Sequence, residues 1–241
     1  MTASPARRFY KQVGVTGSGV SFSIALDDRP LRTPLKRPLD LPTRSLAEAV
    51  AAEWEAQGPR IEPHTMPFTK LANTALDRVA TDRERIIGEI VEFAGSDLIC
   101  YRAATPTDLA ERQARLWQPV LDWARQAFKG EFQATEGILH IAQPPASLAA
   151  LQDYLATRSP WLLTALHNMT TLTGSALLSA MACEKGLPPS EAWLAAHVDE
   201  DWQIEQWGWD EEARHRRDFR KWEFDTCLRF CELSHHKRPE G

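Results

Sequence analysis

The sequence predicts an α+β protein in which a small N-terminal antiparallel β-sheet precedes a larger all-helical body. Alternating apolar residues at strand spacing are confined to the first 45 residues, whereas the rest of the chain shows apolar residues at the three- and four-residue steps of amphipathic helices. Strands and helices do not alternate, which argues against a doubly wound fold. We therefore expect a β domain over residues 1–45 and a helical domain over residues 46–241.

The predicted sheet begins with a β-hairpin. Residues 20–26 alternate apolar side chains with small or polar ones, and Val13 and Val15 precede them at strand spacing. The glycine-rich run at residues 14–19 lies between these two strands. A phosphate-binding loop would lead into a helix, and no Gly-Lys-Ser/Thr sequence is present. We interpret the run as a hairpin turn and expect no bound nucleotide.

Two proline-limited segments, residues 31–35 and 37–41, complete the predicted sheet as edge strands. The helical part follows, and Thr43 is the predicted N-cap of its first helix. Trp54 lies on the apolar face of this helix, so we expect it to pack in the core. The predicted helices span residues 43–57, 68–79, 82–93, 107–129 with a kink or break at Pro119, 147–157, 160–184, 189–197 and 199–233, and residues 131–142 form a mixed segment with one strand.

Residues 159–183 carry no formal charge, which raises the alternative of a membrane-spanning helix. A transmembrane helix is predominantly apolar over about 20 residues. This segment contains His167, Asn168 and several hydroxyl side chains. We therefore predict a buried core helix and no membrane insertion.

The charge balance argues against a nucleic-acid-binding protein. The chain has 28 basic and 33 acidic residues, a net charge of −5, and lacks the basic face that binding to a phosphate backbone requires. Its 43% hydrophobic content is that of a globular protein. The N-terminus has no apolar run of the kind found in signal peptides, so we expect a cytoplasmic protein with reduced cysteines.

A metal site near the C-terminus is an alternative that the sequence leaves open. Cys227 and Cys231 are four residues apart, and His235 and His236 follow them. Zinc binds such ligands, but the sequence has no Cys-x-x-Cys motif here. We favour buried structural cysteines followed by solvated histidines, and we expect no cofactor.

An enzyme is the alternative function that the sequence leaves open. His140, His167 and His197 are isolated, and no catalytic signature accompanies any of them. His140, His167 and scattered carboxylates of the helical body are the candidates for an acid/base site.

The segment over residues 199–212 is chemically unusual because it combines seven acidic residues with three tryptophans and contains no basic residue. A basic block follows at residues 214–221. Acid–base pairs three and four residues apart would stabilise a solvated helix. Trp202, Trp207 and Trp209 fit that interpretation less well, because large aromatic side chains prefer burial or an interface. The residues alone leave core packing and a protein-binding site as equal alternatives.

The chain resembles the ATP12 family of assembly chaperones over about residues 7 to 233. Each matching stretch is weak alone, but their order and spacing are specific. They are Arg8-Phe-Tyr-Lys11, Leu26-Asp-Asp-Arg-Pro-Leu31 with Thr33-Pro34, Glu53-Trp54 with Gln57, Met66-Pro-Phe-Thr-Lys-Leu-Ala-Asn-Thr74, Asp77-Arg78, Asp97-Leu-Ile-Cys-Tyr-Arg102, Trp117-Gln-Pro119, Thr173-Gly-Ser175, Trp202-Gln-Ile204 and Trp207-Gly208.

The resemblance implies a non-enzymatic chaperone, independent of ATP, that binds the unassembled alpha subunit of F1 ATP synthase before it pairs with the beta subunit. Eukaryotic members carry a mitochondrial presequence and act in the matrix. The absence of one here suggests a bacterial, cytoplasmic member. We expect the acidic tryptophan segment to contact the client, with carboxylates meeting basic groups and the tryptophan making an apolar contact. The candidate client-binding residues are Glu200, Asp201, Gln203, Glu205 and Trp207.

Overall fold

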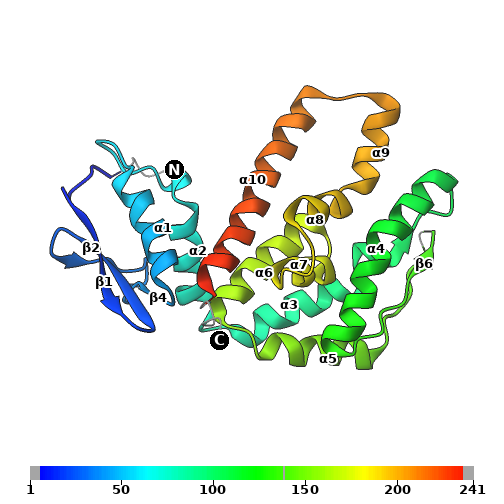
Figure 1. Ribbon diagram of the computed structural model, residues 1–241, viewed down its shortest axis with the longest axis horizontal. Helices are drawn as coiled ribbons and strands as arrows, with labels where there is room; N and C mark the ends of the chain where they lie inside the picture. The colour runs from blue at the N-terminus through cyan, green and yellow to red at the C-terminus, as the bar shows by residue number, and fades with distance from the viewer. Residues whose placement is uncertain (1–5, 138, 236–241) are drawn as a thin grey trace, which may run out of the picture. The chain divides into compact units, whose positions relative to one another are not determined.

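The computed structural model describes residues 6–137 and 139–235 (Figure 1). Their contacts divide the described chain into two compact units. The first comprises residues 6–83, 160–164 and 229–235, and the second comprises the remaining described residues. The predicted fold class is confirmed, because an N-terminal antiparallel sheet precedes a body made mainly of helices. The domain division after residue 45 stays a prediction.

The first unit contains a four-stranded antiparallel sheet with β2 at its centre. Strand β1 pairs with β2 along its whole length, and β3 and β4 pair with the opposite edge of β2. Gly17 and Gly19 have φ of 95° and 70°, so the glycine-rich run forms the hairpin turn that the sequence predicts. The strands are β1 (Val13–Ser18), β2 (Ser21–Leu26), β3 (Arg29–Pro30) and β4 (Asp40–Leu41).

Helix α1 (Arg44–Glu55) packs on this sheet and contributes Leu46 and Val50 to the core. The alternating side chains of β2 supply the facing layer, in which Ile24 is fully buried. The predicted N-cap is confirmed, because the Thr43 hydroxyl accepts a hydrogen bond of 3.1 Å from the Leu46 N–H.

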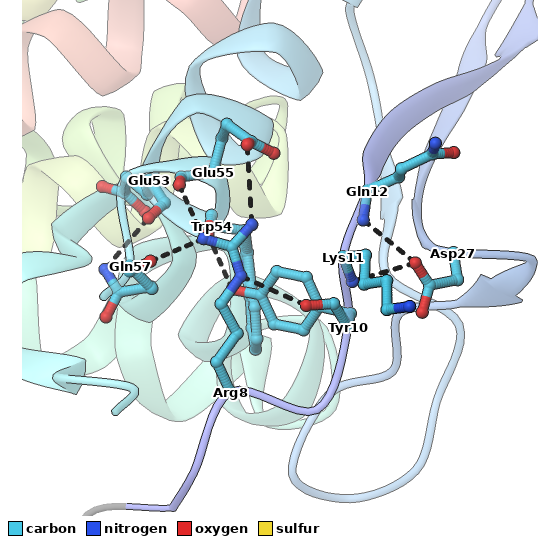
Figure 2. Close-up of polar contacts among 9 residues, drawn as sticks. All are labelled: Arg8, Tyr10, Lys11, Gln12, Asp27, Glu53, Trp54, Glu55 and Gln57. Carbon is cyan, nitrogen blue, oxygen red and sulfur yellow. Dashed lines mark hydrogen bonds and ion pairs between the residues drawn. The ribbon is translucent and has the colours of Figure 1, made fainter. Parts of the chain in front are cut away.

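The chain that leads into β1 is attached to the C-terminal end of α1 (Figure 2). The Arg8 guanidinium donates hydrogen bonds to the carbonyl oxygens of Gln57 (2.6 Å) and Glu55 (3.1 Å). The Tyr10 hydroxyl donates to the Trp54 carbonyl at 2.6 Å, and the Trp54 ring packs edge-on against Tyr10. The last carbonyls of a helix lack partners within it, and a cation there is favourable. Two stretches of the family resemblance therefore serve to join the first strand to α1.

Glu53 of α1 caps the next helix, α2 (Pro67–Thr74). Its carboxylate accepts hydrogen bonds from the N–H groups of Phe68 (2.6 Å) and Thr69 (2.8 Å) and from the Thr69 hydroxyl (2.7 Å). Burial of the carboxylate raises the pKa of Glu53, and these hydrogen bonds offset only part of that effect. Helix α2 continues into a π-helical turn, η2 (Ala75–Val79).

The second unit is mainly helical, and its helices follow the predicted order. One short strand, β5, was not predicted from the sequence, and it pairs in parallel with β6. Three of its helices, α3, α6 and α10, have residues in both units. Short 3-10 turns lie at Pro63–Thr65 and Leu98–Cys100. The elements are α3 (Arg83–Gly95), β5 (Tyr101–Arg102), α4 (Thr107–Phe128), β6 (Thr135–Glu136), α5 (Pro145–Ala156), α6 (Pro160–Thr173), α7 (Ala176–Cys183), α8 (Pro189–Ala196), α9 (Val198–Trp207) and α10 (Glu211–Ser234).

The prediction of a single helix over residues 160–184 is wrong. Helix α6 ends at Thr173, and Gly174 has φ of 71°, which takes the chain out of the helix. The Ser175 hydroxyl then accepts a hydrogen bond from the Leu178 N–H at 3.0 Å and caps α7. Within the described part of the chain, no helix is both long enough and apolar enough to cross a membrane.

The stretch over residues 199–233, which the sequence predicts to be helical, is divided into two helices. Helix α9 ends at Trp207, Gly208 has φ of 84°, and α10 begins at Glu211.

By contrast, α4 runs through Pro119 without the expected break. Trp117 of α4 is fully buried, and its indole N–H donates to the Ala195 carbonyl at 2.7 Å, which ties α4 to α8.

Candidate functional site

All five candidate client-binding residues lie in α9 of the second unit (Figure 1). Helix α9 packs against α4 and α8. Val198, in its first turn, is buried, whereas Glu200 and Asp201 are half-buried. Gln203, Glu205 and Trp207 are exposed to solvent. The structure therefore brings the five residues together on one helix but gives them different surroundings.

Glu205 forms a two-pronged ion pair with Arg112 of α4. The guanidinium donates to the two carboxylate oxygens at 2.7 and 2.9 Å. The hydrogen bond from Arg112 lowers the pKa of the Glu205 carboxyl. About half of the Glu205 side chain is open to water, and exposed pairs contribute at most about 1 kcal/mol to stability. The pair thus fixes the position of Glu205 more than it stabilises the fold.

Glu200 and Asp201 both contact Arg217 of α10. The Arg217 side chain is largely buried, lies 3.3 Å from the Glu200 carboxylate and donates a hydrogen bond to Asp201. Its guanidinium also lies over the rings of Trp209, at 5.7 Å, and of Trp193, at 5.9 Å. Arg217 therefore connects the acidic helix to α10 and to two tryptophans.

The remaining polar groups at this end of α9 face α4 as well. Asp199 accepts a hydrogen bond of 2.5 Å from the Gln113 amide, and the Trp202 indole donates to Asp108 at 3.2 Å. Four carboxylates of α9 are thus bound to groups of the same chain, which spacing along the sequence did not indicate. A basic group on a client would therefore have to share or displace Arg112 or Arg217.

Large aromatic side chains on and after α9 are exposed, and we call Trp207, Trp209, Phe219 and Trp222 the aromatic group. Trp207 is 84% exposed and Phe219 58% exposed, and Trp209 and Trp222 are 51% and 44% exposed. The Phe219 and Trp222 rings are neighbours, with centroids 5.7 Å apart. Exposed aromatic side chains of this size are typical of protein-binding surfaces.

Sequence reasoning missed Phe219 and Trp222. The available signal was their position: an aromatic pair three residues apart in a highly charged stretch, ahead of the buried Phe224. Helical geometry places residues three apart on neighbouring positions of one face. Helix α10 buries Phe224 and leaves the Phe219–Trp222 pair in solvent.

The three isolated histidines, of which His140 and His167 belong to the enzyme alternative, each have a different partner. His140 lies 2.9 Å from the Tyr101 hydroxyl, and His167 lies 2.7 Å from the Glu89 carboxylate. His197 is buried and stacked on Trp193, and burial lowers its pKa. The structure thus shows no shared acid/base arrangement among these three side chains.

The residues of the metal alternative are placed as follows. Cys227 and Cys231 are buried in α10, and a ring nitrogen of His235 lies 2.8 Å from the Cys231 carbonyl. His236 lies outside the described residues. Among those that are described, no group of three or more histidine, cysteine, aspartate or glutamate side chains is arranged to hold a metal ion.

Comparison with known proteins gives one consistent family. The family model for the ATP12 chaperone protein matches residues 7–125. The crystal structure of Atp12 from Paracoccus denitrificans has a TM-score of 0.90 and 37% identity, over 95% of this chain and 99% of that one. An aspartate-to-lysine mutant of the Paracoccus protein has a TM-score of 0.91 and 36% identity, over 96% and 100% of the two chains. A chaperone candidate from Agrobacterium tumefaciens has a TM-score of 0.88 and 44% identity, over 94% and 85%.

Proposed function

The chain belongs to the ATP12 chaperone family, and from this premise we propose that it binds the unassembled alpha subunit of F1 ATP synthase and prevents its aggregation before it pairs with the beta subunit. It acts without ATP, in the cytoplasm of a bacterium. The identity of 37% over nearly the full length of the Paracoccus protein supports a shared role.

The observation that carries the proposal is the exposure of Trp207 beside a fixed ion pair. A subunit that has lost its partner exposes apolar surface that promotes aggregation. A reversible binder needs apolar side chains that can cover this surface, and tryptophan supplies a large area with few rotatable bonds. Trp207 is almost fully solvated, two residues from the Glu205–Arg112 pair. This combination resembles a binding hot spot with a charged rim.

The remaining candidate residues have two roles in this proposal. Gln203 and Trp207 are exposed and contact the client directly. Glu200, Asp201 and Glu205 hold α9 in place through arginines and present partly neutralised carboxylates at the rim. A basic client group can compete for Glu205, because an exposed ion pair costs little to rearrange.

The enzyme alternative finds no support in the positions of its candidate groups. An active site needs titratable side chains that converge on one pocket. His140, His167 and His197 instead contact a tyrosine, a glutamate and a tryptophan respectively. The family description, a chaperone, also favours a non-enzymatic protein.

The proposal is tested by expressing the full chain together with the F1 alpha subunit, or with the F1 beta subunit, of the same organism. We expect the alpha subunit to become more soluble and to co-elute with the chain on size-exclusion chromatography, while the beta subunit does not. Absence of an alpha complex in both assays would refute the alpha-subunit assignment. Co-elution with beta alone would reassign the client.

Charge reversal at Glu205 tests the rim. We expect Glu205→Lys to weaken alpha-subunit binding about tenfold, because the new lysine repels Arg112 and any basic client group. The free energy of unfolding should change little, since the pair is exposed. The matched control is Glu48→Lys, which reverses an exposed glutamate paired with Arg44 on α1. If urea unfolding shows a large loss of stability in Glu205→Lys, then Glu205 is a structural residue and not part of the client-binding rim.

A further inference from the structure

Strand β1 has one edge that no other strand of the described chain covers. Among the described residues, β1 pairs with β2 only. The Asp27 N–H, just after β2, donates a hydrogen bond of 2.8 Å to the Gln12 carbonyl, just before β1. In an antiparallel ladder, every second residue of a strand makes such bonds to the neighbouring strand. Gly14 and Thr16 therefore bond to β2, whereas the N–H and C=O groups of Val13 and Val15 point outward.

This edge lacks two of the features that usually prevent strand addition, a charged side chain and a proline. Natural edge strands carry charged residues, prolines or bulges. The opposite side of the sheet follows this rule, because its short strand β3 ends at Pro30. The β1 strand contains neither a charge nor a proline. Gly17 has φ of 95°, so the regular part of the edge is residues 13–16.

Apolar surface accompanies the unpaired backbone. Val13 and Val15 are paired in register with Leu26 and Ile24, which are buried, so the two valines lie on the same face of the sheet as that core. Both valines are only half-buried, and no strand formed by residues 6–137 or 139–235 lies beyond them. Phe9 before the strand and Val20 in its hairpin turn are largely exposed. An added strand would cover the two valines with its own side chains.

We propose that the outer edge of β1 accepts an extended, uncharged segment of the client, with apolar or β-branched side chains at alternate positions, as an additional antiparallel or parallel strand. This inference rests on the proposed chaperone function. It adds a second contact, in the first unit, to the one made through α9. Main-chain hydrogen bonds supply the affinity in such complexes, and alternate side chains supply the selectivity.

The size of the edge favours a client over a second copy of the chain. The edge is four residues long, at about 3.4 Å per residue, and the sheet is about 10 Å thick. Its exposed surface is therefore roughly 100 to 200 Å². A stable interface buries about 800 Å² on each partner. The edge alone is therefore too small to hold a homodimer, but it suits a partner that is already bound elsewhere on the chaperone.

Amide hydrogen exchange in the full chain tests the proposal directly. NMR should show that the Val13 and Val15 amides exchange rapidly in the free protein and at least about tenfold more slowly in the complex with the alpha subunit. The Gly14 and Thr16 amides, already bonded to β2, should change little. Unchanged exchange at Val13 and Val15 in a complex that does form overturns the strand proposal and leaves the chaperone function intact.

Two other outcomes of this experiment also overturn the proposal. If no alpha-subunit complex forms, the proposed function fails and the strand proposal fails with it. If the Val13 and Val15 amides become protected in the free protein as its concentration rises, the edge pairs with a second copy of the chain rather than with a client.

A pair of substitutions at Val15 separates the backbone from the side chain. Val15→Pro removes the outward N–H and leaves the β1–β2 hydrogen bonds intact, and proline is tolerated on edge strands. We expect it to weaken alpha-subunit binding about tenfold relative to Val15→Ala, which loses side-chain packing but keeps the donor. Circular dichroism and the melting temperature verify that both variants fold. Equal binding by folded Pro and Ala variants contradicts strand addition.

Discussion

Replacing Asp97 with alanine is expected to lower the free energy of unfolding by about 3 kcal/mol or more, because it leaves several buried N–H groups without an acceptor. The Asp97 side chain is completely buried in the second unit. It accepts hydrogen bonds from the Ile99 N–H at 3.3 Å and from the Leu177 N–H, in the first turn of α7, at 3.1 Å. Its carboxylate thus joins the Asp97–Arg102 stretch of the family resemblance to the start of α7, which is far away in the sequence. Urea unfolding followed by circular dichroism measures the loss.

The Asp97→Asn variant isolates the charge of this carboxylate. Burial raises the pKa of Asp97 from 3.8 to about 6, although hydrogen bonds from Ser175, Leu177, Ile99 and Ala176 act in the opposite direction. The folded chain therefore holds this proton more tightly than the unfolded chain. The stability that protonated Asp97 contributes is present below about pH 4 and is lost as the pH rises through about 6.

The asparagine variant cannot titrate, so the difference between its unfolding free energy and that of the wild type reports on Asp97 alone. From pH 4 to pH 7, this difference should move in favour of Asp97→Asn by on the order of 2 to 3 kcal/mol. A difference that stays constant over this range would show that the Asp97 carboxyl does not change its protonation state there.

The elements that sequence analysis predicted correctly are those with a strong periodic pattern. The alternation in β2 has a period of two, and the Thr43 cap is followed at once by the apolar face of α1. The two helical stretches that contain an internal break lie where periodicity carries no information. One carries almost no formal charge and the other is rich in charge on both sides of its break, so neither composition changes sharply at Gly174 or Gly208. The glycines themselves, and Ser175 as the N-cap of α7, are the local signals of the breaks.

The sequence singled out the candidate segment but not the pairing of its residues. The unusual composition of residues 199–212 was visible in the sequence, and the exposure of Trp207 agrees with the interface alternative. Arg112 and Arg217 could not be identified as partners of the acidic residues, because tertiary packing brings α4 and α10 to α9. Spacing along one helix reports only on neighbours three and four residues away.

Truncation of Trp207 is expected to have the largest effect on client binding. We expect Trp207→Ala to lower the affinity for the alpha subunit about a hundredfold, or about 2.7 kcal/mol, as is typical of a tryptophan hot spot. Trp207 is 84% exposed in the chain alone, so the free energy of unfolding should change by less than about 0.5 kcal/mol. Isothermal titration calorimetry and urea unfolding measure the two quantities. The matched control is Leu139→Ala, which truncates a side chain that is 77% exposed and lies outside α9 and α10.

The salt dependence of binding separates the aromatic contribution from the charged one. An apolar contact made by Trp207 depends weakly on ionic strength, whereas an ion pair with Glu205 weakens as salt screens it. Trp207→Ala should therefore lower affinity equally at low and high salt, while the loss in Glu205→Lys should shrink as salt is added. If Trp207→Ala binds like the wild type and Glu205→Lys does not, the carboxylate rather than the indole recognises the client. In that case the Arg112 pair must open when the client binds, and Arg112→Ala should strengthen binding by freeing Glu205 for it.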